Sequence, residues 1–537
     1  MPEQADEPPA TWEPELAELH RRRQLAQRMG GPERVARQRA SGRGTVRERI
    51  GGLLDAGSWE ETGSVAGVGS YGDDGALEDL QPANMLVGQG AVEGRRVIVQ
   101  GDDFTVRGGA ADAAIWEKMV WAERAAHDLR LPLVRLVDGT GGGGSVRTLE
   151  SMGFSYVPPL PGFEFDVANL SRVPVVAAAL GPCAGLGAAR VVLSHFSVIV
   201  RGTAQLFVAG PPVVAWAMHE TPDKEELGGS RAQTRAGAVD NEAADEEDAL
   251  AQLRRFLSYL PSSVWEAPPV VASTDPPDRR EGELLAIVPR DERKPYKMRR
   301  ILELVLDTGS VFELGARFGR STITALARLD GVPVGVIASD PNVYAGGLTA
   351  EAAEKATRFI DLCDQFRLPV VNLVDQPGFV VGTAAERAGT MRRGARMLAA
   401  TIQAQTPWAS VIVRKCYGIA GAAHGDGSRL NQRWAWPSGS WGSLPIAGGL
   451  EAAYRRDLEA AEAAGGPAAR AALRGEIDTR LSAVTSPFRS AERFSIEEIV
   501  DPRDTRRILC AWAANAARIV AQDVVAGPPV RLRGLRP

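Results

Sequence analysis

The segment LPLVRLVD at residues 131–138 recurs as LPVVNLVD at residues 368–375. The same spacing relates further pairs: Glu117-Lys118 with Glu354-Lys355, Gly109 with Gly346, and Gly141 with Gly378. Further along, CAGL at residues 183–186 recurs as CYGI at residues 416–419, at a slightly shorter spacing. This period is longer than the roughly 20–50 residues of solenoid repeats, so it indicates a duplicated domain. Because glycine-rich backbone recurs at matching places, we expect a site that handles two chemically similar groups.

The length of the chain agrees with a duplication. A chain of 537 residues exceeds the size at which a single hydrophobic core keeps growing. Residues 266–295 are rich in proline and charge, as expected of a linker between the two copies. We therefore predict an N-terminal tail and helix over residues 1–40, one domain over 41–270 and a second domain over 271–537.

Composition excludes several classes of protein. The formal net charge is −5, which leaves no electrostatic footprint for nucleic acid. The 4 cysteines lack the spacing of a metal site or of a disulfide framework. The polar, acidic N-terminus is unlike a signal peptide, and no run approaches the roughly 18 apolar residues of a membrane span. We expect a cytoplasmic enzyme that needs no metal, nucleic acid or membrane.

Short apolar runs bounded by glycine alternate with longer helical patterns, which is typical of βαβ units and of an α/β fold with a largely parallel sheet. In the first copy the pattern predicts strands over 96–99, 133–137 and 175–180 and a helix over 111–130. In the second copy it predicts strands over 334–338 and 369–374 and a helix over 351–367.

The signatures of serine hydrolases, zinc proteases and P-loop NTPases are absent from the sequence. Residues 67–72, GVGSYG, match the dinucleotide fingerprint, but a polar stretch follows where its helix should begin. We therefore predict a loop at this place. His424 lies in a Gly/Ala-rich run beside the second glycine turn, and we favour a structural role for it over acid/base chemistry.

The strongest chemical signal comes from the backbone. A strand that ends in a glycine-rich turn and opens a helix presents unpaired N–H groups to an oxyanion. Gly185 and Leu186 lie at such a turn in the first copy, and Ile419 and Ala420 lie at one in the second. Small residues at one such turn would be explained by tight packing alone. Two equivalent turns in a duplicated unit favour a catalytic role, because preorganised N–H donors stabilise an enolate.

The chain also carries a set of ordered motifs between about residues 45 and 507. They include RERI at 47–50, DFT at 103–105, GPCAG at 181–185, LGG at 227–229, AGGL at 345–348, KATRFI at 355–360, DQPGF at 375–379, RKCYG at 414–418 and IVDP at 499–502. With these motifs the chain resembles the carboxyltransferase (β) subunits of biotin-dependent acyl-CoA carboxylases, the family of propionyl-CoA and acetyl-CoA carboxylases.

The resemblance implies two tandem crotonase-like (ClpP/crotonase) domains, each a ββα superhelix. It implies that amides at Gly185 and Leu186 hold the acyl-CoA thioester oxygen, and that amides at Ile419 and Ala420 hold the ureido oxygen of carboxybiotin. The same resemblance marks further residues as substrate-binding: Gly108, Gly109, Gly141, Gly142, Gly346, Gly347 and Ala422. The family usually has glycine where this chain has Leu186 and Ile419, so the bulkier side chains must either point away from the ligands or narrow the site.

The resemblance also implies partners. Biotin would be carried on a separate biotin carboxylase or biotin carboxyl carrier subunit, and acyl-CoA would be the substrate. A site shared between subunits requires a homo-oligomer, at least a dimer, and relatives form hexamers. Two alternatives stay open: a decarboxylase of malonyl- or methylmalonyl-CoA type with the same fold, and a non-catalytic structural subunit of a mixed carboxylase complex.

Overall fold

The computed structural model describes residues 11–109, 113–139, 149–150, 152–157, 160–425 and 431–527. The chain divides into two compact units, Met1–Arg255 and Phe256–Arg536. The division falls inside helix α11 (Glu246–Tyr259), whose apolar residues Leu253, Phe256 and Leu257 are buried. The predicted substrate-binding residues Gly141 and Gly142 lie outside the described residues.

The first unit is built on a seven-stranded sheet with the strand order β1-β4-β5-β6-β7-β9-β11. These strands are β1 (Glu60–Thr62), β4 (Met85–Val92), β5 (Arg95–Asp102), β6 (Leu133–Val137), β7 (Val175–Ala179), β9 (Phe196–Val200) and β11 (Asn241–Ala243). The β1–β4 and β4–β5 pairs are antiparallel, and every pair from β5 to β11 is parallel. A short parallel pair, β8 (Pro182–Ala184) with β10 (Gln205–Phe207), forms a separate sheet.

The helices of the first unit include α4 (Trp116–Leu129), α6 (Phe163–Asn169) and α7 (Leu186–Val192). The others are α1 (Glu13–Gln27), α2 (Pro32–Ala40), α3 (Val46–Leu53), α8 (Pro211–Met218), α9 (Lys224–Gly228) and α10 (Ser230–Ala236). Met119 and Ala122 of α4 pack with Ile98 and Leu133 of the sheet in one core cluster. The predicted strands of this unit are confirmed, and the predicted helix begins later, at Trp116, because Ile115 is extended.

The second unit repeats this plan around an eight-stranded sheet with the order β12-β13-β14-β15-β16-β17-β19, in which β18 also pairs with β16. Its strands are β12 (Phe312–Leu314), β13 (Thr322–Leu329), β14 (Val332–Ser339), β15 (Val370–Gln376), β16 (Trp408–Tyr417), β17 (Gln432–Ala435), β18 (Ser440–Gly442) and β19 (Glu498–Ile499). As in the first unit, an antiparallel pair (β13–β14) leads into parallel strands.

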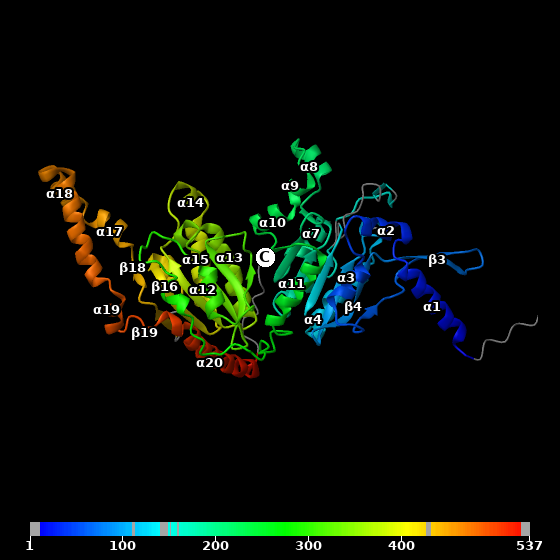
Figure 1. Cartoon of the computed structure of the whole chain (residues 1–537). Coiled ribbons are helices and arrows are strands. Elements are labelled where there is room, and N and C mark those ends of the chain that lie inside the picture. Colours follow the sequence, from blue (N-terminus) through cyan, green and yellow to red (C-terminus); the bar gives the residue numbers. More distant parts are fainter. Residues whose placement is uncertain are drawn as a thin grey trace, which may run out of the picture. The chain divides into compact units, whose positions relative to one another are not determined.

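Helices α13 (Ala350–Gln365) and α15 (Thr390–Gln403) pack side by side, and α13 lies against β13 and β14 (Figure 1). The other helices are α12 (Met298–Val305), α14 (Thr383–Arg387), α16 (Gly418–Ala422), α17 (Ile446–Ala453), α18 (Arg455–Val484), α19 (Pro487–Glu492) and α20 (Thr505–Ala526). The strands and the helix predicted here are confirmed.

Within the described residues, one stretch, Pro502–Ala526, is long and apolar enough to cross a membrane by length and composition. Helix α20 in this stretch packs Leu509, Trp512 and Ala513 into the main core of the second unit. Of the most apolar window of this stretch, 33% is buried inside the structure.

The predicted loop at residues 67–72 is wrong. Residues Gly67–Tyr71 form strand β2, which pairs antiparallel with β3 (Leu77–Pro82). A Cβ atom added to Gly67 would lie 2.4 Å from the carbonyl oxygen of Gln81. The glycine therefore allows close approach of the partner strand, and the dinucleotide fingerprint is a hairpin.

Two lysines show the duplication in three dimensions. Lys118 of α4 donates its Nζ to the carbonyl of Gly63 at 3.1 Å, and Lys355 of α13 donates to the carbonyl of Gly315 at 3.1 Å. Both glycines have a positive φ, +66° and +63°. Burial lowers the pKa of both lysines, that of Lys355 to about 7. Each lysine therefore links its helix to the loop that follows the first strand of its own sheet, β1 or β12.

Candidate active site

In the first unit, the turn between β8 and α7 consists of Gly185, which has φ +57° and ψ −120°. This conformation is readily available only to glycine. The Gly185 N–H donates to the carbonyl of Phe207 on the neighbouring strand β10, at a long distance of 3.3 Å. The first α-helical hydrogen bond closes from Ala189 N to Gly185 O at 3.0 Å.

The N–H groups of Leu186, Gly187 and Ala188 come before that first helical bond. None of the three has an acceptor among the residues that the structure describes. Gly185 itself is exposed and Leu186 is half-buried, so the turn is open at its surface. Open N–H groups at the start of a helix are suited to hold a carbonyl oxygen on which negative charge develops.

The second unit has the same arrangement where β16 leads into α16. Gly418 has φ +65°, and strand β18 lies parallel to the end of β16. In the described part of the chain, no acceptor lies within hydrogen-bond reach of the Ile419 or Ala420 N–H groups. The Ile419 side chain is 57% exposed and Ala420 is fully buried. The Ile419 side chain therefore lies at the surface of the turn, where it either points away from a ligand or narrows the opening.

Strand register decides which residues of the two turns correspond. Cys183 pairs with Leu206, and Cys416 pairs with Trp441, so the two short parallel pairs are equivalent. The spacing that relates Cys183 to Cys416 then matches Leu186 with Ile419 and Gly187 with Ala420. Gly187 is a candidate that the sequence analysis missed, although this same spacing would have identified it.

The glycine loops that follow β5 and β6 meet beside the first turn. A Cβ atom added to Gly139 would lie 3.2 Å from the Cα of Gly109 and 3.6 Å from the carbonyl oxygen of Gly108. The loop after β6 is tied to the strand before the first turn, because Cys183 Sγ donates to the carbonyl of Val137 at 3.5 Å. The structure thus brings Gly108 and Gly109 to the edge of the sheet where Gly185 lies.

The second unit brings its own glycines together in the same way. Gly346 has φ +87°, and a Cβ atom there would lie 2.3 Å from the carbonyl oxygen of Asp375. Beside Gly347, Leu348 N donates to the carbonyl of Gly378 at 3.0 Å. A Cβ atom on Gly378 would lie 3.9 Å from the carbonyl oxygen of Tyr417, next to the second turn. Ala422 lies exposed on α16.

Buried ion pairs hold the strand ends that carry these loops. In the first unit, Arg49 contacts Asp138 at 2.7 Å and Glu246 at 2.6 Å, and it is 2% exposed. Burial by itself would lower the pKa of Arg49, but the two carboxylates raise it above its ordinary value. In the second unit, Asp375, which matches Asp138 in the repeat, pairs with Arg414 at 2.9 Å. Each aspartate comes at or just after the end of a central strand.

His424 lies just after α16 and contacts the sheet. Its Nδ1 is 2.9 Å from the Nδ2 of Asn372, and its carbonyl accepts from Ser410 Oγ at 2.6 Å. The first contact suits a neutral ring whose Nδ1 accepts a hydrogen bond from the Asn372 amide. Burial lowers the pKa of His424 from 6.5 to about 4. These contacts agree with the predicted structural role.

The lowered pKa of His424 predicts a dependence of stability on pH. Between pH 6.5 and about pH 4 the unfolded chain binds a proton on this imidazole and the folded chain does not. We therefore expect the free energy of unfolding to fall as the pH drops through this window. The variant His424→Gln should lose less stability than the wild type over the same window, as measured by denaturant midpoints at pH 7.5, 6, 5 and 4. An equal loss in both proteins would contradict this expectation.

Residues 37–521 match the carboxyl transferase domain family. The chain belongs to this family. It is 35% identical over 506 residues to the propionyl-CoA carboxylase carboxyltransferase subunit of Haloferax mediterranei, with 93% of this chain and 96% of that protein covered. It is 32% identical over 505 residues to the methylmalonyl-CoA decarboxylase subunit alpha of Veillonella parvula, with 93% and 94% covered.

A solved structure of transcarboxylase 12S, described as a hexamer with methylmalonyl-CoA and methylmalonic acid bound, is similar in fold. Its TM-score is 0.83 and its sequence identity 30%, with 95% of this chain and 97% of that chain covered. These findings confirm the family that the motifs indicated, the carboxyltransferase class of enzyme, and the α/β fold of two crotonase-like domains.

Proposed function

We propose that this carboxyltransferase moves a carboxyl group from carboxybiotin to the α-carbon of an acyl-CoA, through an enolate held by backbone N–H groups. The single observation that carries the proposal is the pair of equivalent turns, at Leu186 and at Ile419, whose helix-starting amides have no acceptor among the described residues. Twin donor sites suit a reaction in which two carbonyl groups each develop negative charge in turn.

In the first unit, the N–H of Leu186, with that of Gly185, would hold the thioester oxygen. The long 3.3 Å bond from Gly185 N to Phe207 O makes Leu186 the freer donor of the two. As charge builds on the thioester oxygen when the α-proton leaves, the hydrogen bonds strengthen and lower the barrier. Gly108 and Gly109 would leave room for the pantetheine arm to approach the main chain. Gly141 and Gly142, which lie outside the described residues, stay predicted substrate-binding residues.

In the second unit, the N–H groups of Ile419 and Ala420 would hold the ureido oxygen, with Gly346, Gly347 and Ala422 lining the approach. Ile419 is 57% exposed and Ala420 is fully buried, so the Ile419 N–H would be the more accessible donor of the two. Carboxybiotin supplies the carboxyl group and, after giving it up, a basic ureido nitrogen for the α-proton. The protein's part is to position both oxygens and to stabilise the charge on each.

The biotin would be carried on a separate biotin carboxylase or biotin carboxyl carrier subunit. The hexamer reported for transcarboxylase 12S supports a homo-oligomer here too. In that oligomer the acyl-CoA side of one subunit would face the biotin side of another. A cytoplasmic location is part of this proposal.

The relationship to a methylmalonyl-CoA decarboxylase subunit favours a second candidate function, loss of the carboxyl group from an acyl-CoA. Both reactions pass through the same enolate, so the same donors would serve. The two reactions differ in where the carboxyl group goes, because a carboxyltransferase passes it to or from a biotin carrier and a decarboxylase releases it as carbon dioxide.

The test is to incubate the purified protein with methylmalonyl-CoA, first alone and then with a biotin-bearing carrier subunit. For a carboxyltransferase we expect carboxyl transfer to the carrier and no carbon dioxide release from the protein alone. Rapid decarboxylation without any biotin would favour the second candidate. No turnover in either arm, and none with propionyl-CoA and a carboxylated carrier, would leave only the non-catalytic subunit.

A further inference from the structure

A cluster of buried charged side chains surrounds α7, the helix that starts at the first turn. Its members are Asp102, Glu123, Arg135, Asp166 and Arg190, and none of them is more than 5% exposed. They come from five different elements of the first unit, β5, α4, β6, α6 and α7. Charged side chains are almost never fully buried unless they are paired, so the cluster calls for a physical reason.

Arg135 holds the end of α7 that lies away from the turn. Its Nη1 donates to the backbone carbonyls of Arg190 and Leu193, at 3.2 and 2.6 Å. Its other N–H groups donate to Glu123 Oε1 at 2.9 Å and to Asp166 Oδ1 at 2.5 Å. A cation at the last carbonyls of a helix is favourable, because these carbonyls carry the negative end of the helix dipole. The last turn of α7 is therefore fixed to strand β6.

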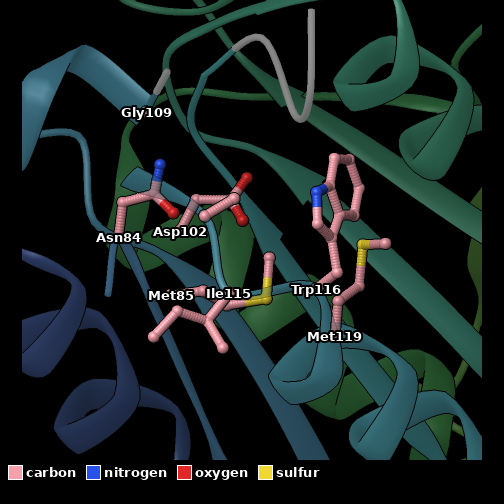
Figure 2. Close-up of a pocket in the computed structure, with 8 residues that line it drawn as sticks. Asn84, Met85, Asp102, Gly109, Ile115, Trp116 and Met119 are labelled. Atoms are coloured by element: carbon pink, nitrogen blue, oxygen red, sulfur yellow. The ribbon is translucent and has the colours of Figure 1, made fainter. Parts of the chain in front are cut away.

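Arg190 ties the same helix to strand β5. Its Nη1 donates to Asp102 Oδ1 at 3.1 Å, and Asp102 Oδ2 accepts from the backbone N–H of Asp138 at 3.1 Å. Figure 2 shows Asp102 at the wall of a small pocket beside Gly109, and the other residues that line this pocket are uncharged. The counter-charge of Asp102 therefore comes from Arg190, and the pair joins α7 to the ends of β5 and β6.

Helix α7 depends on such contacts because its apolar packing is small. It has only 7 residues, and a helix this short is marginal without tertiary contacts. Of its buried residues, Gly187 and Ala188 have little or no side chain, which leaves Val191 and Arg190 to anchor it. Arg190 is the largest side chain that the helix buries. The direction of α7, and of the N–H groups at its start, is therefore set mainly by polar contacts.

Stability alone does not explain the pair of Arg190 and Asp102. The Nε and Nη2 atoms of Arg190 have no acceptor among the described residues, although both atoms are buried from solvent. A buried donor without an acceptor costs stability. In addition, a buried ion pair is often no more stable than well-packed neutral groups of similar volume. The pair is better explained by the position that it gives to α7.

The second unit holds its turn without this pair. The spacing of the strand repeat matches Asp102 with Ser339, whose Oγ accepts from the N–H of Asp375 at 3.2 Å, just as Asp102 accepts the equivalent N–H. The spacing of the two cysteine motifs matches Arg190 with Ala423, which is buried. The acceptor at the strand end is thus common to both units, whereas the ion pair belongs to the unit proposed to hold the thioester.

We propose that Arg190 and Asp102 are positioning residues for carboxyl transfer, whose ion pair fixes α7 so that the N–H of Leu186 stays aligned with the thioester oxygen. The inference rests on the proposed function, because it assumes an acyl-CoA at the first turn. Neither residue need contact the substrate. An oxyanion donor lowers the barrier only while it is aligned, and a misplacement of about 1 Å can cost roughly 10²-fold in rate.

The test replaces the pair by Asp102→Ser with Arg190→Met, which copies Ser339 of the second unit and leaves neither charge alone. We expect kcat for transfer from a carboxylated carrier to propionyl-CoA to fall by about 10- to 100-fold, with little change in KM. The melting temperature, measured by calorimetry, should equal or exceed that of the wild type. Arg190→Lys is the matched control: it keeps a cation beside Asp102 and should retain a higher kcat than the double variant.

A purely structural role of the pair predicts a different result. The double variant would then lose stability, and its folded fraction would keep the wild-type kcat. That result, or a wild-type kcat at unchanged stability, overturns the inference. Should the methionine variant not fold, Asp102→Ser with Arg190→Leu carries the same expectation. If the wild type itself transfers no carboxyl group to any acyl-CoA, the proposed function fails, and the inference fails with it.

Discussion

Replacing Ile419 with proline is expected to slow carboxyl transfer by about 10²- to 10³-fold, which is the cost of deleting one preorganised oxyanion donor. Ile419 follows Gly418, whose φ is +65°, and is the first residue of α16 with helical backbone. Proline is tolerated at this position because the N–H it lacks has no partner inside the helix. The Ile419 side chain is 57% exposed, so its loss removes little packing.

The matched control is Ile419→Ala, which removes the same side chain and keeps the N–H. We expect it to retain activity within a few-fold. Both variants should melt near the wild-type temperature. Both should bind acyl-CoA as the wild type does, because the proposed acyl-CoA donors lie in the first unit. The measurement is the rate of transfer from a carboxylated carrier to propionyl-CoA, with kcat and KM determined separately. Equal activity of the two variants would show that this amide is not a donor in the reaction.

Replacing Asp375 with alanine is expected to destabilise the second unit by about 3–5 kcal/mol. Arg414 donates its Nε and Nη2 to one carboxylate oxygen at 3.1 and 2.9 Å, and Lys415 N donates to the other at 3.1 Å. Asp375 is fully buried and Arg414 is 2% exposed. Removing the carboxylate therefore leaves a buried guanidinium charge and a backbone N–H without their main acceptor.

Chemical denaturation would measure this loss of stability, with unfolding monitored by a probe that lies in the second unit. The exposed pair of Arg433 and Glu497, at 3.1 Å, is the control, and Glu497→Ala should cost less than about 1 kcal/mol. The double variant of Asp375→Ala with Arg414→Met should be more stable than Asp375→Ala alone, because it leaves no uncompensated charge. An Asp375→Ala protein as stable as the Glu497→Ala protein would contradict the buried-pair argument.

Much of the site could be located from the sequence. The repeated strand at 133–137 and 370–374 and the turns at Gly185 and Gly418 follow from local patterns: buried β-branched runs form strands, and glycine ends them. The spacing of the two cysteine motifs even contained the match of Gly187 to Ala420, which strand register made visible. Ion-pair partners were harder to predict, because Arg49 and Asp138, or Asp375 and Arg414, lie far apart in the chain and meet only through the sheet.

The sequence by itself determined the duplicated α/β plan, the family, and the two turns at which backbone N–H groups open a helix. Only the tertiary structure decided which of those N–H groups have no hydrogen-bond acceptor among the described residues. The neighbour of Gly185 is Phe207 on β10, beyond α7 and β9 in the chain, and the outward direction of Ile419 depends on how α16 packs. The pocket beside Gly109 likewise arises where α4 meets the ends of β4 and β5. Local sequence fixes backbone preference over a few residues, whereas hydrogen-bond partners and cavities are set by segments that meet after folding.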